Sequence, residues 1–131
     1  MAKRAISGVD AVEVRVDCLP EPPAMEDVQR LAAPAIVTVR DPVEGGARAL
    51  SFSEREALYF ELLPAAAAVD VEVRNLKAFG AVVKAAHTAG VPVIASSHDF
   101  EKTPSRAALR RTAARARNLG ATCVKFAATP R

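Results

Sequence analysis

The stretch Ala11-Val12-Glu13-Val14-Arg15-Val16-Asp17 alternates apolar and charged side chains with a period of two. This alternation is typical of a β-strand that has one apolar face and one polar face. The segment from Val69 to Arg74 repeats the pattern. Because parallel strands that are buried on both faces are nearly all apolar, the charged face needs another explanation. We expect a barrel in which the valines contact outer helices and the charged side chains meet inside.

Five strand-like segments alternate with helix-like segments along the chain. The strands are predicted at residues 11–17, 35–40, 69–74, 92–97 and 121–127. This rhythm favours right-handed βαβ units and a parallel sheet, which is an α/β architecture. A complete barrel typically needs about 250 residues. The 131 residues therefore predict a single truncated domain, residues 1–131, with about five parallel strands of a partial (β/α)8 (TIM-type) barrel.

Three of the predicted helices carry end signals. Ser53 and Glu56 have the spacing of a capping box, and Pro64 is expected to end or bend the helix that follows them. Gly90 is expected to end the next helix. The last helix is expected to start at Thr103-Pro104 and to stop before Gly120. Its predicted buried stripe consists of Leu109, Ala113, Ala116 and Leu119.

Composition excludes several classes of protein. Half of the residues are hydrophobic, so the chain can bury a core, and charges interrupt every long apolar stretch, so we expect no membrane span. The net charge of +3 reflects arginines in the last helix, which we interpret as a solvated face and not as a nucleic-acid site. Cys18 and Cys123 lie in different segments, and no secretory signal is evident. A reduced cytoplasmic location is expected.

Lys125 stands alone in the apolar run from Ala121 to Ala127, which we interpret as a buried strand. An ammonium is costly in such a place unless it is paired or neutralised. Since desolvation and nearby cations lower the pKa of a lysine, this residue is a candidate amine nucleophile that forms a Schiff base with a carbonyl. The alternative is a lysine at a strand end whose charged group reaches solvent.

Four segments, taken together, resemble one enzyme family. They are SHDFEKTP at 97–104, CVKFA at 123–127, the stretch from Arg40 to Gly46 that contains Glu-Gly-Gly, and the stretch from Glu13 to Asp17. In the order in which they occur along the chain, they resemble the type I 3-dehydroquinate dehydratases, the Schiff-base lyases of the shikimate pathway, which are (β/α)8 barrels. A Schiff-base aldolase on a similar barrel is the other enzyme class that we considered.

The resemblance implies a reaction and a role for each matching residue. Lys125 would condense with the C3 ketone of 3-dehydroquinate, and His98 would move the protons while Glu44 orients its ring. Arg15 and Arg40 would bind substrate hydroxyls, and Glu13 would accept from a hydroxyl and hold Arg15 in place. No cofactor is expected, since the iminium is the electron sink. No metal site is expected either, because the histidines and cysteines match no usual zinc spacing.

The resemblance also implies what the sequence lacks. The first strand and the last two β/α units of such a barrel have no counterpart, and neither do the carboxylate-binding arginine and the closing loop that those units carry in the family. Three hypotheses remain: a minimal dehydratase completed by a partner, a ligand-binding or assembly module that retains the pocket residues, or an internal piece of a longer protein. An open sheet with exposed edges predicts a homo-oligomer, most simply a two-fold dimer.

Overall fold

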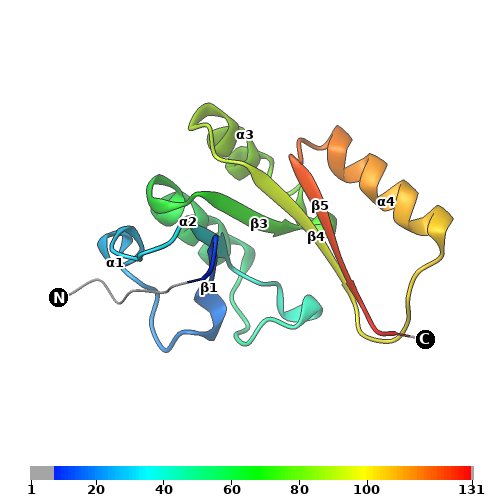
Figure 1. The fold of residues 1–131 in the computed structure, drawn as a ribbon, viewed down its shortest axis with the longest axis horizontal. Helices are drawn as coiled ribbons and strands as arrows, with labels where there is room; N and C mark the ends of the chain where they lie inside the picture. Colours follow the sequence, from blue (N-terminus) through cyan, green and yellow to red (C-terminus); the bar gives the residue numbers. More distant parts are fainter. Residues whose placement is uncertain (1–7, 131) are drawn as a thin grey trace.

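The computed structural model describes residues 8–130, which form one parallel sheet of five strands (Figure 1). The strands are β1 (Val12–Arg15), β2 (Ala35–Thr38), β3 (Ala68–Glu72), β4 (Val93–Asp99) and β5 (Cys123–Ala128). They pair in the order β1-β2-β3-β4-β5, with every neighbouring pair parallel. Consecutive order without a reversal is the order of strands around a barrel, so the predicted partial barrel is confirmed.

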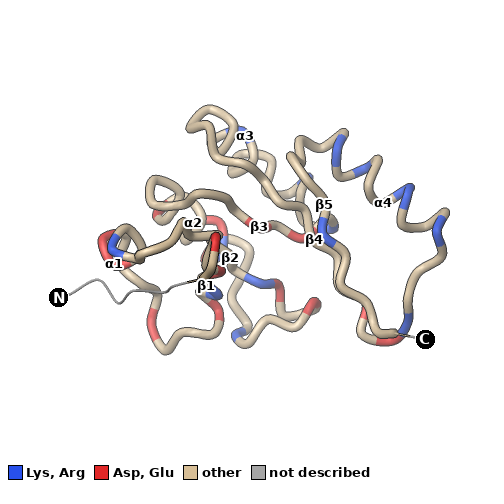
Figure 2. The backbone as a smooth tube through the Cα atoms, viewed as in Figure 1, with Lys and Arg blue, Asp and Glu red and all other residues tan. Residues whose placement is uncertain are grey.

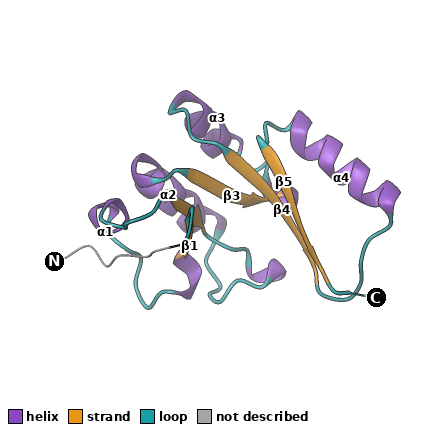
Figure 3. Cartoon of the chain, in the orientation of Figure 1, coloured by secondary structure: helices purple, strands orange, loops and turns teal. Residues whose placement is uncertain are grey.

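Helical segments connect successive strands (Figure 3). The α-helices are α1 (Met25–Gln29), α2 (Phe52–Leu62), α3 (Gly80–Thr88) and α4 (Arg106–Asn118). Four short 3-10 helices accompany them: η1 (Val16–Cys18), η2 (Pro42–Glu44), η3 (Leu63–Ala65) and η4 (Val73–Asn75). No helix between residues 8 and 130 has the length and apolar character needed to cross a membrane.

Valines on the outer face of the sheet form the core against the helices. Val37, Val69 and Val93 have no exposed surface, and α2 and α3 pack on β2 and β4. The alternation in the sequence therefore correctly predicted which face of each strand is apolar. The opposite, concave face carries charged side chains, and several of these are buried too: Arg40, Asp70 and Glu72 are at most 2% exposed.

Two predicted helix starts were wrong by about half a turn. The capping box is formed by Ser51 and Glu54, not by Ser53 and Glu56: Ser51 Oγ accepts from Glu54 N, and Glu54 accepts from Ser51 N. Helix α4 begins after Ser105, whose hydroxyl accepts from Ala108 N, and not at Thr103. The predicted ends are confirmed, because α2 ends at Leu62 and gives way to η3, which contains Pro64, and Gly90 and Gly120 have positive φ angles after α3 and α4.

The last β/α unit is less buried than the sequence indicated. In β5, Cys123, Phe126 and Ala127 are exposed, because among residues 8–130 this strand pairs only with β4. Of the predicted stripe on α4, Ala116 is buried, whereas the leucines at 109 and 119 are only half-buried. An apolar run is compatible with a central strand or an edge strand, and here it forms an edge.

Candidate active site

The candidate site lies on the concave face of the sheet, toward the C-terminal ends of the strands. Side chains two residues apart in a strand share a face, so His98 follows Ser96 on β4, and Lys125 follows Cys123 on β5. In the β4–β5 register Ser96 is opposite Lys125, and His98 is opposite Ala127. The histidine and the lysine therefore project from neighbouring strands on the same face. Their positions differ by two residues in the register of the two strands.

Lys125 is held by a buried carboxylate. Its Nζ lies 2.7 Å from Oδ2 of Asp70, an oxygen that has no other polar contact within residues 8–130. Asp70 is fully buried, while 43% of the lysine side chain is exposed. The expectation that Lys125 lies in a buried strand was therefore wrong, because β5 is at the edge of the sheet. Among residues 8–130, the amine is fixed by its ion pair with Asp70 and not by an apolar enclosure.

Asp70 is the centre of a buried polar network. Its Oδ1 accepts from Arg40 Nη1 at 3.0 Å and from Ser96 Oγ at 2.5 Å. Burial alone would raise the pKa of Asp70, but its contacts with Lys125, Ser96 and Arg40 outweigh burial and hold the pKa below its usual value. Arg40 Nη1 also donates to Glu72 Oε2 at 2.8 Å and to Ser96 Oγ at 2.6 Å. Asp70 is therefore ionised at neutral pH and available to hold an ammonium.

The histidine is positioned by Glu44. Oε1 of Glu44 lies 3.1 Å from Nδ1 of His98 and also accepts from the His98 backbone N–H at 2.8 Å. Its other oxygen, Oε2, is 2.8 Å from Arg74 Nε. A carboxylate held on both sides leaves the imidazole one preferred orientation, with Nε2 as the ring nitrogen that Glu44 does not contact. The structure thus brings together the pair that the sequence predicted.

The Glu-Gly-Gly motif has a steric explanation. Gly45 has a φ of 93°, in the left-handed region that favours glycine, and a Cβ there would approach the ring of Phe100 to 3.0 Å. At Gly46 a Cβ would lie 2.3 Å from the carbonyl oxygen of Arg40. Both glycines let the turn fold tightly back on β2, and this places the Glu44 carboxylate beside His98.

The predicted partners of Arg15 were partly wrong. Arg15 donates to Asp17 at 2.9 and 2.7 Å, and not to Glu13. Glu13 instead accepts from Thr38 Oγ1 at 2.8 Å and lies 3.8 Å from Arg40 Nη2. The chain turns into η1 after Arg15, so Asp17 leaves the strand face and reaches back to the guanidinium. Arg15, Glu13 and Arg40 still lie on the concave face as expected.

Asp17 ties the turn after β1 to the site. It is fully buried and also accepts from the backbone N–H groups of Arg40 at 3.2 Å and Ala47 at 3.0 Å. Burial raises the pKa of Asp17, but the hydrogen bonds from Arg15, Ala47 and Arg40 outweigh it and hold this pKa well below its usual range. The same Arg15–Asp17 hydrogen bonds, only partly offset by burial, raise the pKa of Arg15 above its ordinary value.

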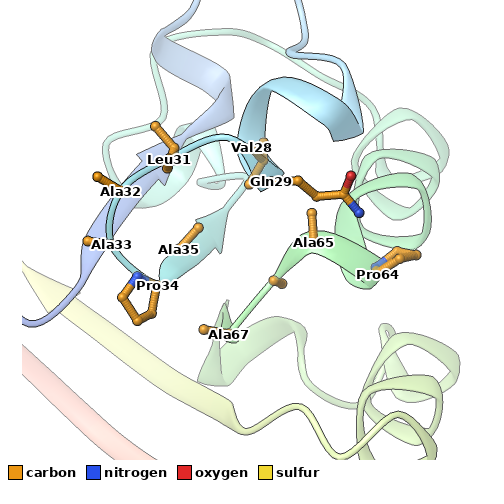
Figure 4. Close-up of a pocket in the computed structure, with 11 residues that line it drawn as sticks. Val28, Gln29, Leu31, Ala32, Ala33, Pro34, Ala35, Pro64, Ala65 and Ala67 are labelled. Carbon is orange, nitrogen blue, oxygen red and sulfur yellow. The ribbon is translucent and has the colours of Figure 1, made fainter. Parts of the chain in front are cut away.

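Two other surfaces lie apart from this cluster. A pocket of about 410 Å³ is lined by small and apolar residues around 28–35 and 64–67 (Figure 4). It lies where β2 and β3 begin, at the end of the strands opposite to the polar cluster. Helix α4 carries arginines and no acidic residue (Figure 2). Within residues 8–130, no group of three or more His, Cys, Asp or Glu side chains is arranged to hold a metal ion.

Comparison with known proteins identifies the family. The family model described as type I 3-dehydroquinase matches residues 1–131. The chain belongs to this family. It is 35% identical to 3-dehydroquinate dehydratase of Klebsiella pneumoniae over 140 aligned positions, and 38% identical to that of Methanocella arvoryzae over 108. These alignments cover 95% and 79% of the chain but 54% and 49% of the relatives.

Solved structures of the family share the fold. The type I 3-dehydroquinate dehydratase of Clostridium difficile, solved with covalently modified comenic acid, is similar with a TM-score of 0.81 and 29% identity. The enzyme of Enterococcus faecalis gives a TM-score of 0.80 at 30% identity. They match 95% and 93% of this chain, and the chain covers 54% and 56% of theirs. The chain thus spans about half the length of the family members it matches.

Sequence reasoning did not assign a site role to three residues of this family member: Ser96, Asn75 and Arg55. Asp70, Glu72 and Arg74 form the charged side of an alternating segment, and that pattern alone is equally compatible with a ligand site and with a structural ion-pair network. Ser96 precedes the SHDF motif and gave no sign that it bonds both Asp70 and Arg40. Arg55 lies among the glutamates of α2, where its sequence context gives no sign that it is buried, and only the folded chain shows its partners.

Proposed function

We propose that this chain carries the dehydration of 3-dehydroquinate to 3-dehydroshikimate through a Schiff base on Lys125. The observation that supports this most directly is the pairing of two reactive side chains with two buried carboxylates on one concave face: Lys125 with Asp70 and His98 with Glu44. Membership of the type I 3-dehydroquinase family supplies the substrate and the reaction class. The enzyme would be a hydro-lyase.

The first step is attack by the amine. Lys125 Nζ must be neutral when it adds to the C3 carbonyl, so its ion pair with Asp70 has to open and its extra proton has to leave. Loss of water from the carbinolamine gives an iminium, which acidifies the proton on C2. The iminium is itself the electron sink, so this reaction needs no cofactor.

The second step is elimination. His98 takes the C2 proton, and the electron pair left on C2 is delocalised into the iminium to form an enamine. The enamine then expels the C1 hydroxyl, which His98 protonates as it leaves, so that one water is lost overall. Hydrolysis of the product iminium releases 3-dehydroshikimate and regenerates the amine. Glu44 holds the ring through Nδ1, so that Nε2 faces the substrate.

Three further residues are proposed to bind the substrate. Arg15 and Arg40 present guanidinium groups to the hydroxyls of a polyhydroxy acid, and Glu13 accepts from a hydroxyl. Arg40 is 2% exposed and already engaged with Asp70 and Glu72. It therefore adds positive potential to the site in addition to any direct contact with the substrate.

The experiment is reductive trapping. Borohydride added together with 3-dehydroquinate should leave a stable adduct on the peptide that contains Lys125, and Lys125→Met should abolish it. An adduct on Lys84 or Lys102, with none on Lys125, would rule out the assignment. Trapping without any turnover of 3-dehydroquinate would instead favour the second function, a ligand-binding or assembly module that retains the pocket.

We also propose a two-fold homodimer in a reduced, cytoplasmic setting, with no role in nucleic-acid or membrane binding. Among residues 8–130, β1 and β5 each pair on one side only, and such edges favour pairing with another chain. Cys18 and Cys123 are free, exposed thiols, which persist in reducing compartments. Residues 1–131 would act as one domain in this assembly.

A further inference from the structure

Arg55 is a buried arginine with no part in the steps above. It lies in α2, an outer helix, yet only 4% of it is exposed. Its guanidinium passes over the ring of Phe79, 5.0 Å from the centroid, and reaches the C-terminal ends of β2 and β3. Burying a guanidinium is costly unless its partners compensate, and an apolar side chain would fill the same space at lower cost. The contacts of Arg55 must therefore explain why a guanidinium is buried at this position.

The first set of partners leads to the lysine. Arg55 donates from Nε and Nη2 to the carbonyl oxygen of Val39 at 3.1 and 2.9 Å, and from Nη2 to Glu72 Oε1 at 2.5 Å. The other oxygen of Glu72 accepts from Arg40, and Arg40 in turn donates to Asp70, the partner of Lys125. Arg55 thus fixes the orientation of the Glu72 carboxylate. Through Arg40 and Asp70, that carboxylate is connected to Lys125.

The second set of partners leads to the histidine. Arg55 Nη1 lies 3.6 Å from Asp41 Oδ2. Asp41 caps η2: its Oδ1 accepts from Val43 N at 2.8 Å, and its carbonyl oxygen accepts from Glu44 N at 2.9 Å. The turn that Asp41 holds is the turn that presents Glu44 to His98. Burial raises the pKa of Asp41, but contacts that include Asn75, Val43 and Arg55 outweigh it and lower this pKa.

Asn75 closes the arrangement. Its Nδ2 donates to Asp41 Oδ2 and to Glu72 Oε1, both at 2.8 Å. Asp41 and Glu72 are thus two carboxylates that share one amide and one guanidinium, that of Arg55. If the guanidinium were removed, two negative charges would face each other with the amide alone between them, and both would shift.

We propose that Arg55 is a positioning residue that holds Glu72 and Asp41 in a fixed relation and thereby couples the placement of Lys125 to the placement of His98. The geometric part of this proposal stands on the contacts of Arg55 alone. Its catalytic part rests on the proposed dehydratase function. The two parts are tested separately, so that failure of one can be distinguished from failure of the other.

The geometric part is tested by amide hydrogen exchange. The amide of His98 donates to Glu44 Oε1 and that of Val43 to Asp41 Oδ1, so both report whether the turn stays in place. In Arg55→Met these two amides should exchange at least about 10-fold faster than in Leu62→Ala, after normalisation to the core strand β3. Leu62 is a matched control because it is buried in the same helix and contributes only apolar contacts. Equal acceleration in the two variants would overturn the proposal.

The catalytic part is tested by turnover of 3-dehydroquinate per folded molecule. Arg55→Met should lower kcat by about 10-fold to 100-fold with little change in KM, because a misplaced lysine and histidine slow the chemistry while substrate contacts remain. Arg55→Lys should recover part of kcat, since an ammonium restores the charge without the fork. Leu62→Ala should keep its kcat, and an equal loss of kcat in that control would reduce Arg55 to a structural residue.

Two complications are covered by the same variants. If Arg55→Met does not fold, Arg55→Lys replaces it in the exchange experiment, where the same two amides should still exchange faster than in Leu62→Ala. If the unmodified chain forms no borohydride adduct and turns over no 3-dehydroquinate, the proposed function fails. The exchange measurement then still decides whether Arg55 holds the turn.

Discussion

The Lys125–Asp70 pair and the His98–Glu44 pair have the same arrangement of contacts. In each, a reactive group contacts one oxygen of a buried carboxylate, and an arginine contacts the other: Arg40 for Asp70, and Arg74 for Glu44. Such a carboxylate cannot rotate freely, so it fixes its reactive partner in turn. The proposed nucleophile and the proposed base are therefore oriented by contacts that do not require a bound substrate.

Substitution of the histidine tests its role. His98→Ala should cut turnover of 3-dehydroquinate by about 10²-fold or more, because the C2 proton loses its acceptor. Borohydride trapping at Lys125 should persist, since Schiff-base formation requires the amine above all. The control is His87→Ala, which removes a ring whose Nε2 lies 2.7 Å from the Gly120 carbonyl oxygen, away from Glu44 and Lys125. Unchanged turnover in His98→Ala would show that another group moves the protons.

The stability of the protein should fall in acid, and Asp17 should account for part of the loss. Its folded pKa is depressed, so its contribution is present above the unfolded pKa of about 3.9 and is lost as pH falls toward the folded value. Between about pH 5 and pH 3 the free energy of unfolding in urea should therefore drop less in Asp17→Asn than in the unmodified chain. At neutral pH the same variant should be less stable by about 1–3 kcal/mol, because buried donors lose their acceptor.

The exposed Asp10 provides the control for this measurement. Asp10→Asn should follow the pH dependence of the unmodified chain. Parallel losses in Asp17→Asn and the unmodified chain would show that the buried carboxylate does not set the acid limit.

At the scale of residues, the contacts of side chains that belong to motifs were predicted better from the sequence than the contacts of side chains outside motifs. Glu44 and His98 were paired correctly because both lie in motifs that resemble the family. Arg15 was assigned the wrong carboxylate, since a turn within η1 brings Asp17 back to it. The exposure of Lys125 could not be derived from the residues around it in the sequence. It depends on whether β5 has a strand on both sides, which is a property of the whole sheet.

At the scale of elements, the start of α2 shows how a local pattern can be ambiguous. The spacing Ser-x-x-Glu occurs twice, as Ser51 with Glu54 and as Ser53 with Glu56. Both are consistent with a capping box, and the choice is made by packing: with the helix starting at Phe52, that ring stacks on Phe79 at 4.6 Å between centroids. Tertiary contact therefore decides between two equal local signals.

Removing the hydroxyl of each serine distinguishes the two boxes. Ser51→Ala should lower the free energy of unfolding by about 1 kcal/mol, within a range of about 0.5–2, because Glu54 N loses its cap. Ser53→Ala, inside the helix, should change stability little or raise it slightly, since alanine is the better helix former. Urea unfolding at neutral pH measures both. A larger loss in Ser53→Ala than in Ser51→Ala would contradict the observed cap.

The strands were predicted well in position and less well in length. All five lie where alternation or an apolar run placed them, but β1, β2 and β3 end earlier, at Arg15, Thr38 and Glu72. After β1 and β3 the chain enters a 3-10 turn, which brings Asp17 back to Arg15 of β1 and Arg74 to Glu44 of η2. Period-two patterning continues through these turns in the sequence, so it could not mark the last paired residue.

At the scale of the whole molecule, a partial barrel could be predicted because one polar and one apolar face recur in successive units. That pattern is incompatible with a flat sheet covered by helices on both sides, and it is compatible with a curved one. The buried charged side chains Arg40, Asp70 and Glu72 contact one another across the strands, as expected on the inner face of such a curved sheet. The alternation of polar and apolar residues could not predict which strands lie at the edges of the sheet. A strand is an edge when it has a neighbouring strand on one side only, and its own sequence does not determine this.

The two edges lead to the prediction of a dimer. Among residues 8–130, β5 has one neighbouring strand, and its Phe126 is 39% exposed. A second copy related by a two-fold axis would bring β1 of one chain near β5 of the other at both edges, which satisfies backbone groups that face solvent in a single copy. Sedimentation at micromolar concentration should therefore give twice the mass of one chain, and addition of 3-dehydroquinate should not reduce it.

A matched pair of substitutions tests the location of this interface. Phe126→Lys places a charge on the β5 edge, where lysines oppose strand pairing, and should weaken the dimer by about 10-fold or more in dissociation constant. Phe60→Lys is the control, because Phe60 is similarly exposed, at 42%, but lies on α2 away from both edges. Equal effects of the two lysines would place the interface elsewhere. A stable, folded monomer of the unmodified chain would remove the dimer altogether and leave Lys125 and Asp70 in a groove open to water.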